Sequence, residues 1–106
     1  MNSYLVILKD KRNGELSNDL LTNHVTYLKR LRQQGSLMLC GPFVDDDGAV
    51  MVFQSESVES VEELLNNDPF VYEKYYQSYE IKEFLEANDG NNWLVGVPQT
   101  KGNLID

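Results

Sequence analysis

The chain has 106 residues, of which 42% are hydrophobic, and this is enough for a single globular domain with a modest core. Its 17 acidic and 9 basic residues give a formal net charge of −8. That charge argues against a general binder of nucleic acid or of anionic membrane lipid, because both partners require a positive surface.

The first half of the chain is predicted to form a strand, a helix and a short strand. Residues 3–9 (SYLVILK) are rich in strand-forming side chains. Ser17 is an N-cap residue at the start of a helix, and Gly35 can adopt the left-handed conformation that ends it. A strand is then expected over residues 37–40, broken by the sequence Gly41-Pro42.

The second half repeats this alternation. Residues 49–54 (AVMVFQ) are predicted to be a strand, preceded by the hairpin signal Asp47-Gly48. Ser57 caps a second helix that ends near residue 67. Asp68-Pro69 begins a short helical turn over residues 70–76, and residues 78–84 (SYEIKEF) are predicted to be a fourth strand.

The order strand, helix, strand, strand, helix, strand is typical of the α+β ferredoxin-like fold. It predicts an antiparallel four-stranded sheet with both helices on one face. The other face then lacks a cover within the chain, so we expect a homodimer. Residues 85–106 would be a C-terminal extension, in which the apolar segment 93–97 (WLVGV) follows a polar linker over residues 86–92. We expect residues 93–97 to add a strand at a sheet edge or across the dimer interface.

Cysteine and histidine content limits the chemistry that the chain can perform. With one of each, it cannot form an intrachain disulfide or a structural zinc site, and we expect neither a metal nor another cofactor. No secretory signal is evident, and a cytoplasmic location is expected. The longest apolar runs are too short to span a bilayer, so no membrane partner is predicted.

The single histidine, His24, lies on the apolar stripe of the first helix. Leu21, His24, Leu28 and Leu31 recur at spacings of 3, 4 and 3, so we expect them to point toward the interior together. A histidine in this position is either a core residue with a hydrogen-bond partner or the centre of a site. Periodicity alone favours the core residue.

Three other groups invite functional hypotheses that ordinary structure explains better. Cys40 could be a nucleophile beside His24, but a cysteine between apolar residues usually behaves as a small hydrophobic side chain. The acidic run 45–47 lacks the alternate ligands of a calcium loop and is typical of a solvated hairpin. The tyrosine cluster is explained mostly by packing, with one phenol free to line a cavity; it comprises Tyr72, Tyr75, Tyr76 and Tyr79.

Taken in order, these motifs resemble the YciI-like (YCII-related) family over about residues 3–84. The resemblance is carried by the helix with His24, then Gly35, then the segments 39–42, 46–48 and 68–70 (DPF). It implies a ferredoxin-like domain over residues 1–84 that pairs as a dimeric α/β barrel. Family members with an assigned reaction resemble lyases that act on chlorinated aromatic catabolites. The family often has Arg where this chain has Leu21, so a cation for a substrate anion is missing there.

The resemblance also implies an active site built on a His–Asp pair, His24 and Asp68. We expect Gly41, Pro42 and Phe70 to contact the substrate. A carboxylate that accepts one ring N–H of a histidine fixes the tautomer and strengthens the other nitrogen as a base. The simpler explanation for Asp68 is that it caps a helix.

Two functions therefore stay open. The first is a cofactor-free enzyme with lyase- or isomerase-like acid–base chemistry on a small organic, aromatic metabolite. The second is a non-catalytic dimeric module that binds a small ligand or a partner in the same cleft.

Overall fold

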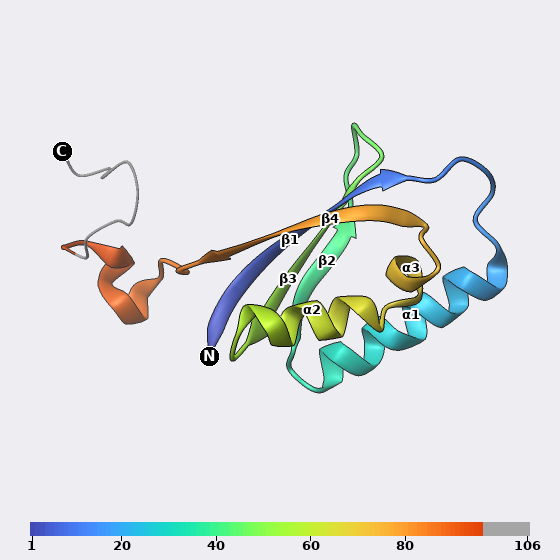
Figure 1. Cartoon of the computed structure of the whole chain (residues 1–106). Helices are drawn as coiled ribbons and strands as arrows, with labels where there is room; N and C mark the ends of the chain where they lie inside the picture. Colours follow the sequence, from blue (N-terminus) through green and yellow to red (C-terminus); the bar gives the residue numbers. More distant parts are fainter. Residues whose placement is uncertain (97–106) are drawn as a thin grey trace.

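The computed structural model describes residues 1–96, which fold into one sheet packed against helices, followed by a separate short helix (Figure 1). The elements, in chain order, are β1 (Asn2–Lys11), α1 (Asn18–Gln33), β2 (Leu37–Pro42), β3 (Ala49–Ser55), α2 (Val58–Asn66), α3 (Pro69–Tyr72), β4 (Tyr76–Phe84) and the 3-10 helix η1 (Asp89–Leu94).

The sheet has the strand order β2-β3-β1-β4, and every neighbouring pair is antiparallel. The helices α1 and α2 lie on the same side of it, with α3 between the end of α2 and the start of β4 (Figure 1). This is the predicted α+β ferredoxin-like fold, and it is confirmed. Both β1 and β4 are longer than expected from the sequence pattern.

The core lies between the sheet and the helices. Along β1, Tyr4, Val6 and Leu8 are buried, whereas Leu5 and Ile7 between them are only partly buried. This alternation follows from the twofold period of a strand, which sends successive side chains to opposite faces. The helices cover one face, so residues of the other face keep part of their surface in contact with solvent.

The predicted helix ends are formed as expected. The Ser17 hydroxyl accepts a hydrogen bond from the Leu20 N–H at 3.1 Å, and Ser57 caps α2 in the same way. After α1, Gly35 has φ +83°, and the Ser36 N–H donates to the Leu31 carbonyl at 3.0 Å. This paired arrangement of a left-handed glycine and a returning N–H is a Schellman motif, which turns the chain directly into β2.

The loop between β2 and β3 requires its predicted glycine. A Cβ atom on Gly48 would lie 2.7 Å from the Leu8 carbonyl oxygen, too close for any other residue without a shift of the backbone. The Asp46 carboxylate accepts the Gly48 N–H at 2.6 Å. The acidic run 45–47 is exposed in this loop, which projects beyond the sheet (Figure 1).

The buried face of α1 differs from the prediction. The buried residues are Leu20, His24, Tyr27 and Leu31. Leu21 is 41% exposed and Leu28 is only partly buried. Both sets include His24 and Leu31 and fit a helical period, so the spacing could not tell them apart. Packing on the sheet chose the set that contains Leu20 and Tyr27.

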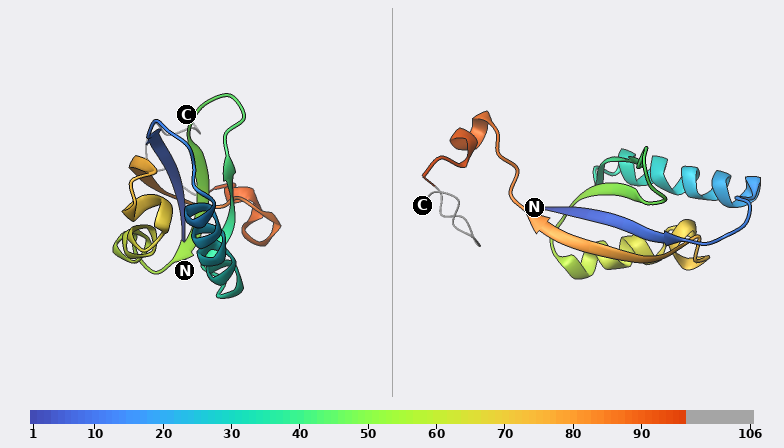
Figure 2. Two further views of the ribbon diagram at one scale, coloured as in Figure 1. Left: turned by 90° about the vertical axis from the view of Figure 1, so that its right-hand side faces the viewer. Right: turned by 90° about the horizontal axis from the view of Figure 1, so that it is seen from above.

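The strand expected over residues 93–97 is not formed by its described part. Residues 89–94 instead make up η1, in which the Trp93 indole N–H donates to Asp89 at 2.8 Å, and Trp93 is 59% exposed. Figure 1 and the right-hand view of Figure 2 place η1 beyond the end of β4, apart from the sheet and helices. Val97 lies outside the described residues.

Among the helices of residues 1–96, none combines the length and the apolar character needed to cross a bilayer.

Candidate functional site

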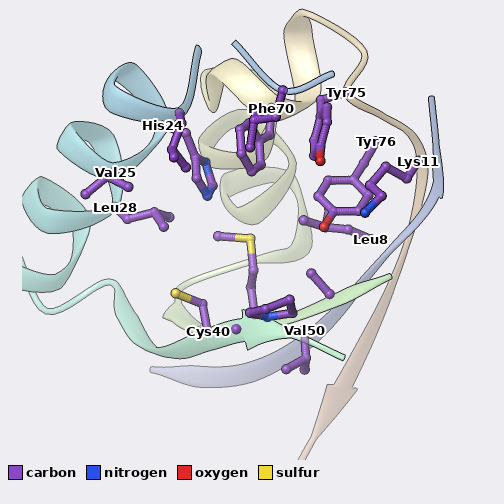
Figure 3. A pocket seen from close by; sticks show the side chains of 16 residues that line it. Leu8, Lys11, His24, Val25, Leu28, Cys40, Val50, Phe70, Tyr75 and Tyr76 are labelled. Atoms are coloured by element: carbon purple, nitrogen blue, oxygen red, sulfur yellow. The ribbon is translucent and has the colours of Figure 1, made fainter. Parts of the chain in front are cut away.

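A cavity of about 450 Å³ opens between α1, the end of the sheet near β2, and the segment that joins α3 to β4 (Figure 3). Most of its wall is apolar. The helix α1 contributes Leu21, His24, Val25 and Leu28, the strands β2 and β3 contribute Cys40, Gly41, Pro42, Ala49, Val50 and Met51, and the remaining wall consists of Leu8, Lys11, Leu16, Phe70, Tyr75 and Tyr76.

His24 and Asp68, 44 residues apart in the sequence, meet at this cavity. His24 Nδ1 lies 2.7 Å from Asp68 Oδ1. The Asp68 side chain is fully buried, whereas His24 keeps 9% of its surface. Since a carboxylate can only accept, Nδ1 carries the proton and the other ring nitrogen, Nε2, is free to accept one. Figure 3 shows a ring nitrogen of His24 turned toward the cavity.

The same carboxylate also caps α3. Asp68 Oδ1 accepts the Phe70 N–H at 2.9 Å, so the cap and the partner of His24 are one oxygen atom. The second oxygen, Oδ2, is buried and has no hydrogen-bond partner among the described residues. The two explanations that the sequence offers for Asp68 are therefore compatible, because the cap fixes the carboxylate in the position that reaches His24.

An aromatic row extends from His24 along one wall. The His24 and Phe70 rings stack with centroids 3.6 Å apart and planes at 6°. Phe70 contacts Tyr75 at 4.6 Å between centroids, and Tyr75 meets Tyr76 edge-on at 5.2 Å. Rings in such arrangements stabilise one another beyond their buried area. The row therefore holds the imidazole in one orientation.

At the far end of this row the cavity becomes polar. Lys11 and Tyr76 line it, and Figure 3 shows the Tyr76 hydroxyl turned inward, with the Lys11 ammonium group beside the ring. Burial raises the pKa of the Tyr76 phenol, and the neighbouring Tyr75 and Asp47 raise it further. At neutral pH Tyr76 is thus a neutral hydrogen-bond donor or acceptor.

Cys40 lines the cavity as well, but its electrostatic surroundings do not activate it. Desolvation of the sulfur raises the pKa of the Cys40 thiol, the Asp68 carboxylate raises it further, and Arg32 opposes this only in part. The thiolate is the nucleophilic form of cysteine, and a raised pKa makes it scarce at neutral pH. Cys40 is exposed rather than packed as the expected small hydrophobic side chain, and its raised pKa does not favour the nucleophile hypothesis.

The structure brings the five residues singled out in the sequence to one place. His24 and Phe70 line the cavity, Asp68 lies directly behind His24, and Gly41 and Pro42 form part of the opposite wall. Of the four clustered tyrosines, Tyr75 and Tyr76 line the cavity, Tyr79 packs against the core and Tyr72 is exposed.

Lys11 was not anticipated from the sequence. It lies in a charged segment next to an Asn-Gly turn signal, where a solvated lysine is the ordinary expectation. What places it at the cavity is the conformation of Asp10, whose φ of +59° could not be read from residue spacing.

Comparison with known proteins identifies the family and the fold. Residues 2–85 match the model of the YCII-related domain. The chain is 28% identical over 68 residues to the uncharacterized protein YjpA of Bacillus subtilis (strain 168), which covers 64% of this chain and 80% of that protein.

Among solved structures, the fold resembles that of 5-chloro-2-hydroxyhydroquinone dehydrochlorinase (TftG) from Burkholderia phenoliruptrix AC1100, in complex with 2,5-dihydroxybenzoquinone. The TM-score is 0.66 at 22% sequence identity, over 85% of this chain and 99% of that one. At this identity the likeness concerns the fold. Because the family match spans most of the sequence, the chain belongs to the YCII-related family.

Proposed function

We propose that the protein is a small enzyme that moves a proton on a small organic ligand, with His24 as the acid–base group and Asp68 as its partner. The observation that carries this proposal is the 2.7 Å contact of His24 Nδ1 with a buried carboxylate, while the opposite side of the ring faces a cavity. A histidine whose only role was packing would need neither a buried charge nor an open side.

The chemistry follows from the tautomer. Nε2 takes a proton from an O–H or an activated C–H of the ligand, and the electron pair of the broken bond stays on the ligand. Asp68 stabilises the imidazolium that forms, because a buried carboxylate attracts the new positive charge strongly. The imidazolium then returns the proton to another ligand atom in an isomerisation. In an elimination the electron pair instead expels a leaving group, and the proton passes to solvent.

The shape of the cavity supports a small, flat ligand. Its aromatic row and its apolar residues from the sheet, which include Met51 and Pro42, suit a ring or another conjugated compound. The structurally similar dehydrochlorinase was solved with a dihydroxybenzoquinone, and this supports a hydroxylated aromatic or quinone-like substrate here. Lyase chemistry on such a compound is the form of the proposal that we favour.

The alternative is a module that binds a ligand in the same cavity without transforming it. The wall is mostly apolar, and an apolar pocket is sufficient for binding. The contact between His24 and the Asp68 carboxylate favours the enzyme, because capping α3 requires an acceptor at Asp68 but not a histidine beside it.

Both functions can be separated by an exchange experiment in deuterium oxide. Small hydroxylated and chlorinated aromatic compounds, 2,5-dihydroxybenzoquinone among them, would be incubated with the protein. Ligand binding and deuterium uptake at carbon would then be followed by NMR. We expect exchange or turnover with the wild type and a loss of at least a hundredfold in His24→Asn.

Asn23→Ala, an exposed change on the same helix, is the control and should exchange at the wild-type rate. If compounds bind to the wild type but neither exchange nor react, the protein is the binding module. If His24→Asn reacts as fast as the wild type per folded molecule, the assignment of the base is wrong.

A further inference from the structure

Lys11 stands at the end of the cavity away from His24. It is the cross-strand neighbour of Tyr76 in the β1–β4 ladder, and both residues line the cavity. Directly opposed residues on antiparallel strands have Cβ atoms within about 5.5 Å of each other. Lys11 Nζ also lies 5.9 Å from the centroid of the Tyr75 ring. The ammonium group is therefore held against the aromatic row by its strand position.

A local break in β1 turns Lys11 toward this side. Regular alternation from the buried Leu8 would place residue 10 on the helix-covered face and residue 11 on the open face. Instead Asp10 has φ +59°, and the ladder with β4 passes from the pair Lys9–Ser78 to the pair Lys11–Tyr76 without a pair at Asp10. The register is the same on both sides of Asp10, so no residue is inserted, and it is the left-handed backbone at Asp10 that breaks the alternation of faces.

Asp10 is held in this conformation by β4. Its carboxylate accepts a hydrogen bond from the Ser78 hydroxyl, and its carbonyl accepts one from the Gln77 side-chain amide at 3.2 Å. A left-handed residue other than glycine is unfavourable unless its surroundings hold it, although Asp adopts this conformation more readily than most residues. Here the consequence of the conformation is the orientation of Lys11.

The charge of the cavity wall differs in sign from that of the chain as a whole. Among the described residues that line the cavity, Lys11 is the permanently charged one and no carboxylate is present, although the chain carries a net charge of −8. Arg12 also lies near the aromatic row, 5.9 Å from the Tyr75 ring centroid, but it does not line the cavity, and it donates to the Glu73 carbonyl at 3.0 Å.

Within residues 1–96, Asp47 is the acidic side chain that pairs with Lys11, at 3.9 Å. Its carboxylate is 86% exposed on the hairpin loop, so water and salt screen the pair, and its stabilisation is small. The ammonium group can therefore turn to a bound anion at little cost.

We propose that Lys11 and the Tyr76 hydroxyl form an anion subsite, so that the cavity selects a planar organic acid with its anionic oxygen at Lys11 and its reacting hydrogen at His24. This inference rests on the proposed function, of which it specifies the substrate class. It makes Lys11 a residue that determines specificity and Asp10 a residue that positions it.

The test uses two probes of almost equal shape, 4-hydroxybenzoate and its neutral amide, 4-hydroxybenzamide, titrated by NMR into the full-length protein. We expect the wild type to bind the acid more tightly than the amide. Lys11→Met should weaken binding of the acid at least tenfold and leave the amide within twofold. Lys11→Arg should restore the preference, because it restores the charge.

The matched control is Lys9→Met, two residues earlier on β1, where the lysine pairs with Glu80 at 3.8 Å and does not line the cavity. It should keep the full preference. Asp47→Asn should tighten binding of the acid about twofold, because it removes the competing carboxylate. Asp10→Val should lose the preference, because a β-branched side chain disfavours the left-handed conformation that turns Lys11 toward the cavity.

Equal affinity of the wild type for the two probes, or failure to bind the acid at millimolar concentration, would overturn the subsite. So would an unchanged preference in Lys11→Met or an equal loss in Lys9→Met. A different outcome would reject the proposed function alone. If the wild type prefers the acid but catalyses no exchange, the anion subsite exists but the protein is not the proposed enzyme. If Lys11→Met still catalyses exchange and still prefers the acid, the protein is an enzyme but Lys11 does not form an anion subsite.

Discussion

The imidazole of His24 lies flat against the ring of Phe70, with centroids 3.6 Å apart and planes at 6°. Phe70 also donates its backbone N–H to Asp68 Oδ1, the atom that contacts His24 Nδ1. One residue thus positions both members of the pair, the histidine through its ring and the carboxylate through its amide. The short helix α3 therefore positions the two residues of the proposed site and does more than connect α2 to β4.

Replacing Phe70 with Leu should loosen the imidazole while leaving the backbone hydrogen bond to Asp68 intact. The lost ring stacking should cost about 1 kcal/mol, which corresponds to a fall in melting temperature of roughly 4–8 °C. We expect ligand exchange to slow more than tenfold, measured per folded molecule. Tyr72→Leu changes an exposed aromatic residue of the same helix and should alter neither quantity. Unchanged exchange in Phe70→Leu would show that stacking does not orient the base.

Replacing Asp68 with Asn separates its two roles. The amide oxygen can still accept from Phe70, so the cap survives, but the amide N–H₂ would be buried without an acceptor, at a cost of about 1–3 kcal/mol. Because a neutral amide cannot stabilise an imidazolium, exchange should fall at least a hundredfold.

Ser57→Ala is the comparison for Asp68→Asn, because it removes a cap from α2 at a site remote from the cavity. It should cost about 1 kcal/mol and leave exchange per folded molecule unchanged. A parallel loss of exchange in the two variants would mean that both act only through stability.

The free energy of unfolding should decline in alkaline solution. Burial raises the pKa of Tyr27 above its ordinary value of 10.0, with Asp68 and Glu63 adding to the effect and Arg30 opposing it. The folded state then keeps a proton that the unfolded state releases. The contribution of Tyr27 is therefore complete below about pH 10 and is lost as the pH rises through the folded-state pKa.

Urea denaturation at pH 8 and at pH 10.5 tests this expectation. Tyr27→Phe should be less stable than the wild type at pH 8, by about 1 kcal/mol, because Tyr27 donates to the Leu64 carbonyl at 2.7 Å. The difference should shrink at pH 10.5. Tyr72→Phe alters an exposed phenol, and its difference from the wild type in free energy of unfolding should be the same at both pH values. If the stability that Tyr27→Phe loses relative to the wild type grows with pH, the predicted direction of the pH dependence is wrong.

The open face of the sheet predicts association of two copies. Leu5 pairs with Val52 and Leu39 with Val52 across neighbouring strands, and all three lie on the face that the helices leave uncovered. Leu5→Lys should convert a dimer to a monomer in light scattering, because two such faces cannot pack with a charge between them. Val44→Lys, at a residue 97% exposed on the hairpin loop, is the control.

Deletion of residues 87–106 would show in the same measurement whether the C-terminal extension contributes to the dimer. We expect the truncated protein to dissociate at a higher concentration than the full chain. A wild type that is monomeric at micromolar concentration would refute the dimer, and a truncated chain that associates like the full one would make the extension dispensable.

The sequence by itself determined the order of the sheet strands and main helices and the residues that cap the helices, because a cap depends on neighbouring residues. Ser17, Ser57 and Asp68 accept hydrogen bonds from N–H groups two or three residues away, and Gly35 ends its helix through its own backbone freedom. From the order of these elements the ferredoxin-like fold follows. The motif resemblance could name His24 and Asp68 as a pair, but spacing could not, because a cap explains Asp68 without any long-range partner.

Only the tertiary structure decided which faces and which distant residues meet. Packing on the sheet selected the Leu20–Tyr27 side of α1 over the equally periodic alternative, and it turned Leu21 toward the cavity rim. The path of the chain brought Asp68 within 2.7 Å of His24 across 44 residues. The left-handed Asp10 aimed Lys11 at the cavity. Each of these depends on a backbone angle or a contact between remote segments, and neither is encoded in the spacing of residues along a single helix or strand.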